Sequence, residues 1–227
     1  MELGARQVAA LLNISEKKLY QWISRKKIPL IRVGSQYRFN KAQLIEWAIS
    51  QKIILSPAIF TDDEPDVSGI HRLDETLKRG GVFYNVKGVD IRTVLEEVIS
   101  LMPLPPEIDR SYVLQVLLAR ETMGSTGIGN GIALPHVRNP IIMHITHPVI
   151  SLCFLENPIE FNALDGKPVH TLFTIISPTP KTHLQVLSRI SYALRDPGFA
   201  ETIKQKADKD RIINAAATIE NALGAES

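Results

Sequence analysis

The order of apolar and polar residues divides the chain into two regions with different predicted elements. Residues 5–49 contain two short stretches with helical spacing, one alternating stretch and a third helical stretch. From residue 70 onward, short apolar runs typical of buried strands alternate with longer amphipathic stretches. This second pattern predicts an α/β fold, a mixed β-sheet flanked by helices, with a small domain ahead of it.

The first region has the pattern of a helix-turn-helix followed by a hairpin. Residues 5–12 form one helical stretch, and Ser15 is suited to cap a second helix that carries cations on its outer side. Residues 30–39 alternate around a Gly-Ser pair, which predicts a hairpin or wing. Asn40, with Gln43 three residues later, predicts the capped start of a third helix.

Glycine, proline and aspartate separate the predicted elements of the second region. The predicted helices are residues 73–79, 90–102, 109–118, a helix capped by Thr182 with His183 in its first turn, 198–206 and 209–223. The predicted strands are residues 82–86, 132–134, 149–155 and 169–176.

Periodicity is lost between the two regions, where two prolines flank an acidic stretch. We therefore expect a first domain over residues 1–50, a linker over residues 51–67 and a second domain over residues 68–227. The apolar first half of the linker, IILSPAIF, is suited to docking on a domain or on a second subunit, so a homodimer stays open.

Charge is distributed unevenly between the two regions. Residues 1–52 carry ten Lys and Arg against three Asp and Glu, a net charge of +7, and the rest of the chain carries −5. This asymmetry indicates that the first domain meets a polyanion. The candidate contacts lie on the second helix and the wing: Lys17, Lys18, Gln21, Arg25, Arg32 and Arg38. Alternatively, these side chains are only the solvated face of a small domain.

The stretch ARQVAALLNISEKKLYQWISRKKIPLIRVGSQYRF resembles the compact winged helix of the excisionase and MerR-type DNA-binding group. The resemblance implies that the helix from Ser15 to Arg25 enters the major groove of DNA. It also implies that Arg32 and Arg38 hold phosphates or reach the minor groove.

One stretch of the second region, TGIGNGIALPHVRNP from Thr126 to Pro140, is arranged for chemistry more than for packing. Its glycines precede a short apolar run, and Pro135 ends that predicted strand because proline offers no ladder donor. His136 is therefore expected at the carboxyl edge of the sheet, where ligands bind in α/β folds. From composition alone, a histidine at a strand end is also explained as a hydrogen-bonded structural group.

Neither standard nucleotide-binding loop fits these glycines. A Walker loop needs a Lys and a Ser or Thr after its last glycine, and a dinucleotide fingerprint needs a following helix, whereas an apolar strand follows here. A donor-rich loop remains, in which Ser125, Thr126, Gly127 and Gly129 are predicted to hold an oxyanion. Beside a histidine, the natural oxyanion is a phosphoryl group.

GIGNGIALPH, with Arg120-Glu121 before it and HLQVLSRISYAL after it, resembles the enzyme IIA domain of the bacterial sugar phosphotransferase system, in its fructose, mannitol and nitrogen-regulatory branch. The resemblance runs from about Ser68 to the C-terminus. It implies that His136 accepts a phosphoryl group from the histidine-containing phosphocarrier protein.

The same resemblance implies that Arg120 binds the phosphoryl group and that His183 is a second active-site histidine. From the residues alone, Arg120 would instead bind the carbonyls at a helix end, and His183 would be a surface residue. Val137 departs from the family, which often has a small residue there, and this concerns the contacts with a partner more than the chemistry.

Composition narrows the remaining classes of protein. The single cysteine, Cys153, cannot form an internal disulfide, no run approaches the roughly 18 apolar residues of a membrane span, and the start lacks a signal-peptide pattern. We expect a cytoplasmic protein with no membrane partner. His144 and His147 have H-x-x-H spacing, but Pro148 argues against the helix that such a pair requires, so neither a metal nor another cofactor is expected.

The two resemblances together imply an enzyme IIA-type phosphoryl carrier, phosphorylated on His136, whose phosphorylation state regulates DNA binding and transcription. In the main alternative, the chain is a transport enzyme IIA that passes phosphate to a sugar-specific enzyme IIB on a separate chain. In a third interpretation, the second domain senses a ligand or a regulatory protein without turnover.

Overall fold

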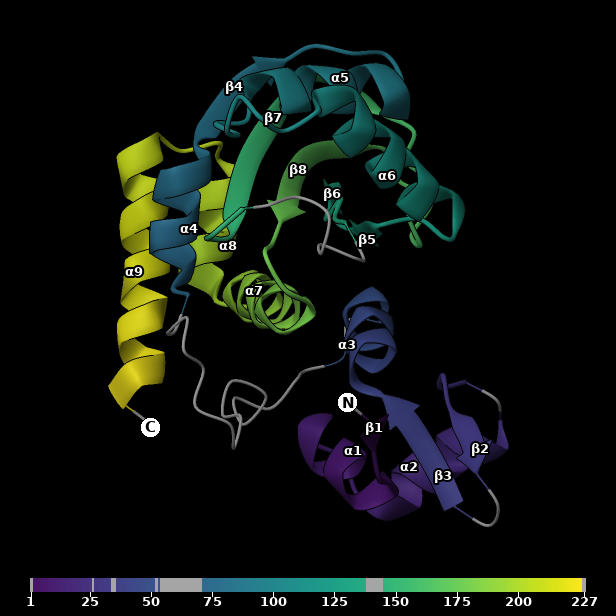
Figure 1. Ribbon diagram of the computed structural model, residues 1–227. Coiled ribbons are helices and arrows are strands. Elements are labelled where there is room, and N and C mark those ends of the chain that lie inside the picture. The colour runs from purple at the N-terminus through teal and green to yellow at the C-terminus, as the bar shows by residue number, and fades with distance from the viewer. Residues whose placement is uncertain are drawn as a thin grey trace. The chain divides into compact units, whose positions relative to one another are not determined.

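The computed structural model describes residues 2–25, 27–33, 36–51, 53, 71–137 and 145–225. They belong to two compact units, Met1–Gly69 and Ile70–Ser227 (Figure 1). Most of the predicted linker and the Gly34-Ser35 turn lie outside the described residues.

The first unit combines three helices with a small antiparallel sheet. Its elements are β1 (Glu2–Leu3), α1 (Ala5–Leu11), α2 (Glu16–Ser24), β2 (Ile31–Val33), β3 (Gln36–Asn40) and α3 (Lys41–Ser50). β3 lies between β1 and β2 and pairs antiparallel with both. The sequence pattern misses β1, because two residues are too short to show a period.

The predicted caps begin two of these helices. The Ser15 hydroxyl accepts the Lys18 amide at 3.2 Å at the start of α2, and the Asn40 side chain accepts the Gln43 amide at 3.2 Å at the start of α3. Fully buried apolar side chains from all three helices and from β3 form the core of the unit: Val8, Leu12, Leu19, Phe39, Leu44 and Ile45.

The second unit is a five-stranded mixed sheet between two layers of helices. Its elements are α4 (Leu73–Gly80), β4 (Val82–Val86), α5 (Ile91–Leu101), α6 (Arg110–Thr122), β5 (Gly127–Gly129), β6 (Ile132–Ala133), β7 (Val149–Ile159), β8 (Val169–Ile176), α7 (Pro180–Ala193), α8 (Pro197–Lys204) and α9 (Lys209–Ala225). The strand order is β4-β7-β8-β6-β5, in which β4–β7 and β6–β8 are parallel and the other pairs antiparallel. The predicted fold class is confirmed.

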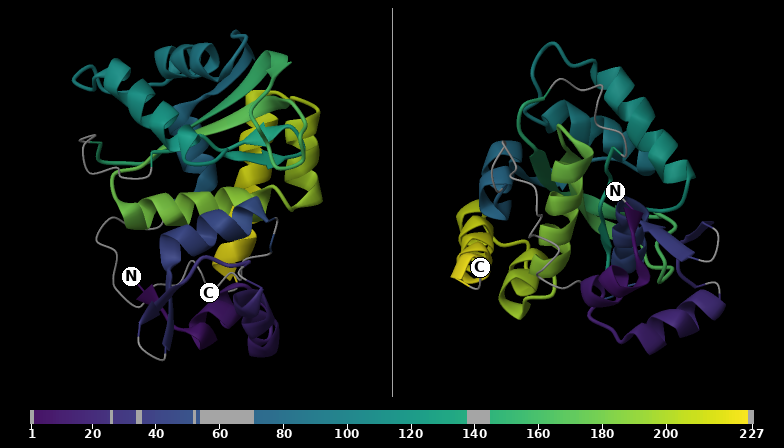
Figure 2. Two further views of the ribbon diagram at one scale, coloured as in Figure 1. Left: turned by 90° about the vertical axis from the view of Figure 1, so that its right-hand side faces the viewer. Right: turned by 60° about the horizontal axis from the view of Figure 1, so that its bottom comes forward.

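Helices cover both faces of this sheet. Figures 1 and 2 show α5 and α6 on one face and α4, α7 and α9 on the other. β7 and β8 are the central pair, and their almost continuous apolar sequences follow from burial on both faces. The α5–α6 side of the core includes Val98, Leu117, Cys153, Leu172 and Ile176.

Three local predictions are corrected by the structure. Helix α7 begins at Pro180 and is capped by Thr179, whose hydroxyl accepts the Thr182 amide at 3.1 Å, because proline is favoured in the first helical position. The cap predicted at Thr182 is therefore wrong. β7 continues four residues past the predicted end at residue 155, since Ile159 pairs with Val169 beyond an irregularity. Residues 127–129, predicted as loop, form the edge strand β5.

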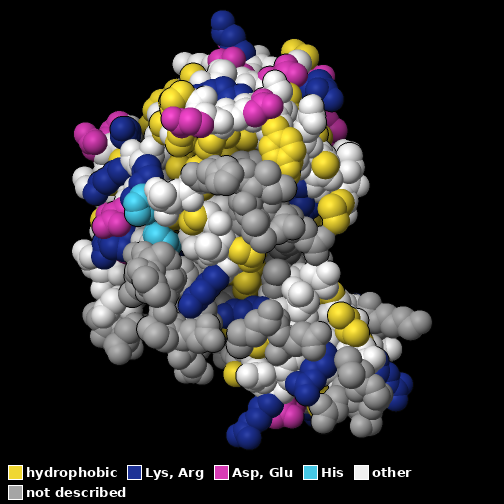
Figure 3. Space-filling model, viewed as in Figure 1, with side chains coloured by type: hydrophobic (Ala, Val, Ile, Leu, Met, Phe, Trp, Pro, Cys, Tyr) yellow, Lys and Arg dark blue, Asp and Glu magenta, His cyan; other side chains and the backbone are white. Residues whose placement is uncertain are grey.

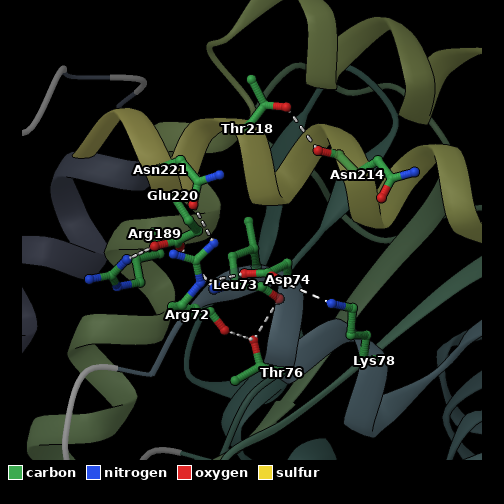
Figure 4. Close-up of polar contacts among 10 residues, drawn as sticks. All are labelled: Arg72, Leu73, Asp74, Thr76, Lys78, Arg189, Asn214, Thr218, Glu220 and Asn221. Carbon is green, nitrogen blue, oxygen red and sulfur yellow. Dashed lines mark hydrogen bonds and ion pairs between the residues drawn. The ribbon is translucent and has the colours of Figure 1, made fainter. Parts of the chain in front are cut away.

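A buried polar network joins α4, α7 and α9 (Figure 4). The Glu220 carboxylate of α9 accepts the Leu73 amide at 2.8 Å and forms an ion pair with Arg189 of α7. Arg72, the residue before α4, donates to the Asn221 side chain at 3.0 Å. No side chain of its own caps the start of α4, so Glu220 satisfies one of the free amides there from a distant element.

In the part of the chain that the structure describes, no helix has the length and apolar character needed to cross a membrane.

Candidate active site and candidate nucleic-acid interface

His136 follows β6 and is held at the edge of the sheet by β8. It forms a parallel bridge with Ile175, whose amide donates to the Pro135 carbonyl at 2.9 Å. The regular strand ends at Ala133, so one further backbone bond carries the histidine beyond the strand that Pro135 terminates. His136 therefore projects from the carboxyl end of a strand that is parallel to β8.

The partners of the two His136 ring nitrogens determine where its proton lies. Nδ1 lies 2.8 Å from the Leu134 carbonyl oxygen, and a carbonyl only accepts, so Nδ1 donates. Nε2 accepts from Nε of Arg120 at 3.1 Å. His136 is thus the Nδ1–H tautomer, and its lone pair on Nε2 points toward a guanidinium.

Arg120 lies in the last turn of α6 and makes both contacts that the sequence left as alternatives. Its Nη1 donates to the Gly124 carbonyl at 2.9 Å, as expected of a cation at a helix end, while its Nε donates to His136. The guanidinium plane is thereby fixed beside the imidazole.

His183 brings a second ring from α7. The ring centroids of His136 and His183 are 4.8 Å apart and their planes are inclined by 40°. Both rings are buried, with 3% and 2% of their surface exposed. Three groups from α6, from the end of β6 and from the first turns of α7 thus meet in one cluster, and an anion placed there would lie beside a guanidinium and two imidazole rings.

The glycine-rich segment supports this cluster with donors that are already engaged. The Thr126 amide and hydroxyl donate to the two oxygens of Glu121 at 2.8 and 2.7 Å. The Ser125 hydroxyl donates to the Phe161 carbonyl at 2.5 Å and accepts the Gly127 amide at 2.9 Å. Gly129 is a strand residue of the β5–β6 hairpin. The structure therefore shows Ser125, Thr126 and Gly127 engaged in hydrogen bonds within the protein, and the contact of these four residues with an oxyanion stays a prediction.

The other histidines do not join this cluster through any described contact. His144 lies outside the described residues, and the rings of His71 and His147 are 6.4 Å apart. Among the described side chains, no three His, Cys, Asp or Glu residues converge as a metal-ligand set.

In the first unit, the predicted DNA contacts lie on the solvent side of α2 and on the small sheet. Those of α2 and Arg32 of β2 are exposed, and Arg38 of β3 is half-buried. In the face drawn in Figure 3, Lys and Arg predominate over this unit, whereas both signs of charge mix over the second. Lys18 Nζ lies 5.4 Å from the centre of the Trp22 ring, which packs edge-on against Trp47 of α3.

Sequence reasoning missed an aromatic pair on this surface. Tyr20 of α2 is 47% exposed, and its ring lies 6.2 Å from that of Tyr37 on β3 in an edge contact. The pair joins the second helix to the predicted wing. An aromatic residue on the polar side of an amphipathic helix was the available signal.

Comparison with known families supports both units separately. The family model described as phosphoenolpyruvate-dependent sugar phosphotransferase system, EIIA 2, matches residues 75–218, and a helix-turn-helix domain model matches residues 2–52.

Named relatives agree with this assignment. The chain is 33% identical over 153 residues to the nitrogen regulatory protein of Pseudomonas aeruginosa, which covers 66% of this chain and 97% of the relative. It is 36% identical over 134 residues to the nitrogen regulatory protein of Escherichia coli, covering 58% and 78%. The crystal structure of nitrogen regulatory protein IIA-Ntr from Neisseria meningitidis is similar with a TM-score of 0.55 and 25% identity, covering 63% of this chain and 97% of that chain.

These coverages also show what distinguishes this chain. A match that spans 97% of the Pseudomonas relative leaves that relative too little sequence for a further domain as long as residues 2–52. The helix-turn-helix unit is therefore an addition with respect to this relative.

Proposed function

The chain belongs to the EIIA 2 family of the phosphoenolpyruvate-dependent sugar phosphotransferase system and carries a helix-turn-helix domain ahead of it, and we propose that it is a regulatory phosphoryl carrier that binds DNA. In this proposal His136 is phosphorylated by the histidine-containing phosphocarrier protein. The relatives named nitrogen regulatory protein favour regulation over sugar transport.

The observation that carries the phosphoryl-acceptor role is the contact of Nε2 of His136 with Arg120, with the His183 ring beside the same imidazole. A nitrogen must offer its lone pair to attack phosphorus, and the Leu134 carbonyl keeps the proton on Nδ1, the other nitrogen. The guanidinium and the second ring supply positive or donor groups for the phosphoryl oxygens, the main requirement for phosphoryl transfer.

The proposed step balances without a net proton transfer. Nε2 of His136 forms a bond to phosphorus while the bond from phosphorus to the phosphocarrier's imidazole nitrogen breaks. That nitrogen keeps the electron pair, and the phosphocarrier's ring, which is protonated on its other nitrogen, leaves as a neutral imidazole. Nδ1 of His136 keeps its proton, and the positive charge that grows on the ring is stabilised by the Leu134 carbonyl. Arg120 must first release the Nε2 lone pair, after which its donors bind the phosphoryl oxygens.

Incubation with the labelled, phosphorylated phosphocarrier tests this role. We expect stable labelling of the wild-type protein and none of His136→Ala, with the label sensitive to acid as expected of a phosphohistidine. Undiminished labelling of the variant would show that another residue accepts phosphate. Onward transfer to a separate enzyme IIB would favour the transport alternative.

The DNA-binding role depends on the first unit and its excess of positive charge. Lys17 and its neighbours on α2 are exposed, and the net charge of −5 over residues 53–227 disfavours binding through the second unit. Duplex DNA titrated at increasing salt should bind with a steep salt dependence. Lys17→Gln should lower the slope by about one, whereas Lys209→Gln, an exposed control in α9, should not.

Regulation is tested by the same titration with phosphorylated protein. Phosphate on His136 adds up to about two negative charges, which change the electrostatics of any surface that binds there. Binding curves that separate support the regulatory proposal, and curves that superimpose remove the link between phosphorylation and DNA binding.

A further inference from the structure

We propose that Glu121 is a positioning residue for the phosphoryl-acceptor site: through Thr126 and Leu134 it holds the carbonyl that keeps the proton on Nδ1 of His136. This inference rests on the proposed phosphorylation of His136. In the bonds described above, the Glu121 side chain binds Thr126 and does not itself bind the His136 ring.

A continuous chain of hydrogen bonds connects the two residues. Both donors of Thr126, its amide and its hydroxyl, are held by the Glu121 carboxylate at 2.8 and 2.7 Å. The carbonyl of Thr126 accepts the Leu134 amide at 3.0 Å. The carbonyl of Leu134 accepts Nδ1–H of His136 at 2.8 Å. Two residues, Thr126 and Leu134, thus link the Glu121 carboxylate to the His136 ring.

The last turn of α6 is connected to both ring nitrogens of His136. Arg120 reaches Nε2 of His136 directly, and the next residue, Glu121, reaches Nδ1 through Thr126 and Leu134. Arg120 also donates to the Gly124 carbonyl at 2.9 Å. The turn between α6 and β5 is therefore stabilised by this bond and by the bonds between Thr126 and Glu121. A shift of this turn would therefore move both partners of the imidazole together.

The chemistry explains why the Leu134 carbonyl matters. If the carbonyl moved away, the imidazole would be free to carry its proton on Nε2 instead. Nε2–H and Arg120 Nε–H would then face each other as two donors, and Nε2 would have no lone pair for phosphorus. This series of hydrogen bonds therefore preserves both the lone pair on Nε2 of His136 and its contact with the Arg120 guanidinium.

A carboxylate suits this position because both of its oxygens accept. Glutamine in its place offers one oxygen and one NH2 group, so one of the two Thr126 donors would meet another donor. Thr126 is 5% exposed, and a buried donor left without an acceptor carries a desolvation penalty. We therefore expect Glu121→Gln to displace Thr126, although the substitution changes neither of the two histidines nor Arg120.

The test measures the tautomer and the transfer rate separately. Ring-labelled histidine followed by 15N NMR should show His136 protonated on Nδ1 in the wild type and a measurable share of the Nε2–H form in Glu121→Gln. Phosphorylation at saturating phosphocarrier should be slower by on the order of 10- to 100-fold, the scale of a misplaced reacting group.

Two further variants keep the test decisive. Thr126→Val removes only the hydroxyl donor and should shift the tautomer in the same direction but less, and its effect should not add to that of Glu121→Gln. Glu160→Gln is the matched control, because Glu160 also accepts a backbone amide, that of Asn162 at 2.7 Å, but does not belong to the series of hydrogen bonds that leads to His136. It should leave both readouts unchanged.

The outcomes separate this inference from the proposed function. Glu121→Gln with wild-type ring signals and a wild-type rate would overturn the inference even if His136 is phosphorylated. A wild-type protein that accepts no phosphate would overturn the proposed function, while the NMR comparison would still decide whether Glu121 controls the tautomer. If Glu121→Gln does not fold, unchanged signals and rate in Thr126→Val would overturn the inference.

Discussion

Two clusters of buried ionisable side chains in the second unit share helix α7 but are built on different principles. In the network of α4, α7 and α9, the Arg189 guanidinium faces the Glu220 carboxylate, and that carboxylate also caps the start of α4 (Figure 4). In the cluster around His136, the Arg120 guanidinium donates to an imidazole nitrogen, and a second imidazole lies beside it. The first cluster pairs opposite charges within the protein, whereas the second gathers donors around one lone pair.

The difference separates a structural role from a chemical one. In a buried ion pair the two partners satisfy each other and have no strong interaction left for a ligand. Removing one partner therefore lowers the stability of the protein. A cluster of rings and a guanidinium gains most when an anion enters it, so its removal should be felt as lost phosphoryl transfer. His136 and His183 are as deeply buried as Arg189 and Glu220, so burial alone does not distinguish the two clusters, whereas pairing does.

Breaking the network should give the largest effect. Glu220→Ala leaves the buried Arg189 without its partner and the start of α4 without its cap, and should lower the free energy of unfolding by about 3–5 kcal/mol. Urea unfolding measures it. Replacing both partners by apolar residues, as in Arg189→Met with Glu220→Leu, should recover most of the loss, and a double variant as unstable as the single one would contradict the pairing argument.

A substitution in the cluster around His136 should instead affect phosphoryl transfer. Arg120→Gln removes the cation beside Nε2 and should slow phosphorylation of His136 by about 10²- to 10³-fold, the usual cost of one transition-state donor. Its free energy of unfolding should change far less than that of Glu220→Ala. Single-turnover transfer and urea unfolding on the same preparation check the two halves, and a rate near the wild-type value would remove Arg120 from the mechanism.

Cys153 on β7 offers a reporter that tells the two clusters apart. Burial, with a smaller contribution from Glu97, raises the pKa of this thiol to about 12, so the native protein should resist a thiol reagent at neutral pH. Labelling then reports opening of the unit. It should be faster in Glu220→Ala and unchanged in Arg120→Gln, and rapid labelling of the native wild type would contradict the burial of the thiol.

The smallest effect concerns the hairpin that leads to His136. Burial, and then the charge of Lys206, lowers the pKa of His170 below its ordinary 6.5. His170 packs where any side chain on Gly131 would collide with it, since a Cβ there would lie 2.2 Å from its Nε2.

In the unfolded chain His170 takes up a proton at a higher pH than in the folded protein. Its contribution to stability is therefore complete above pH 6.5 and declines as the pH falls below 6.5. Unfolding measured at pH values on both sides of 6.5 should show a slightly smaller loss toward acid in His170→Gln than in the wild type. Identical pH profiles would contradict the lowered pKa.

Local signals were sufficient for most of the fold. Ser15 and Asn40 cap α2 and α3 as predicted, and the apolar run of β8 matches its predicted bounds, because caps and periodicity depend on neighbours in the sequence. The cap of α7 lies at Thr179 and not at Thr182, because Pro180 is favoured in the first helical position, which is an equally local signal. β1 pairs with β3, which is far away in sequence, and β5 is a three-residue, glycine-rich strand that pairs with its neighbour β6, so neither is long enough to show a period.

The residues of the site divide in the same way. The order Pro135-His136 already favours a histidine just past a strand, because proline offers no ladder donor. Only the packed structure determines which ring nitrogen keeps the lone pair, that Arg120 and His183 reach the same imidazole, and that Glu121 binds Thr126. These are pairings between polar groups of separate elements, and such pairings are set by how the elements pack and not by the residues adjacent in the chain.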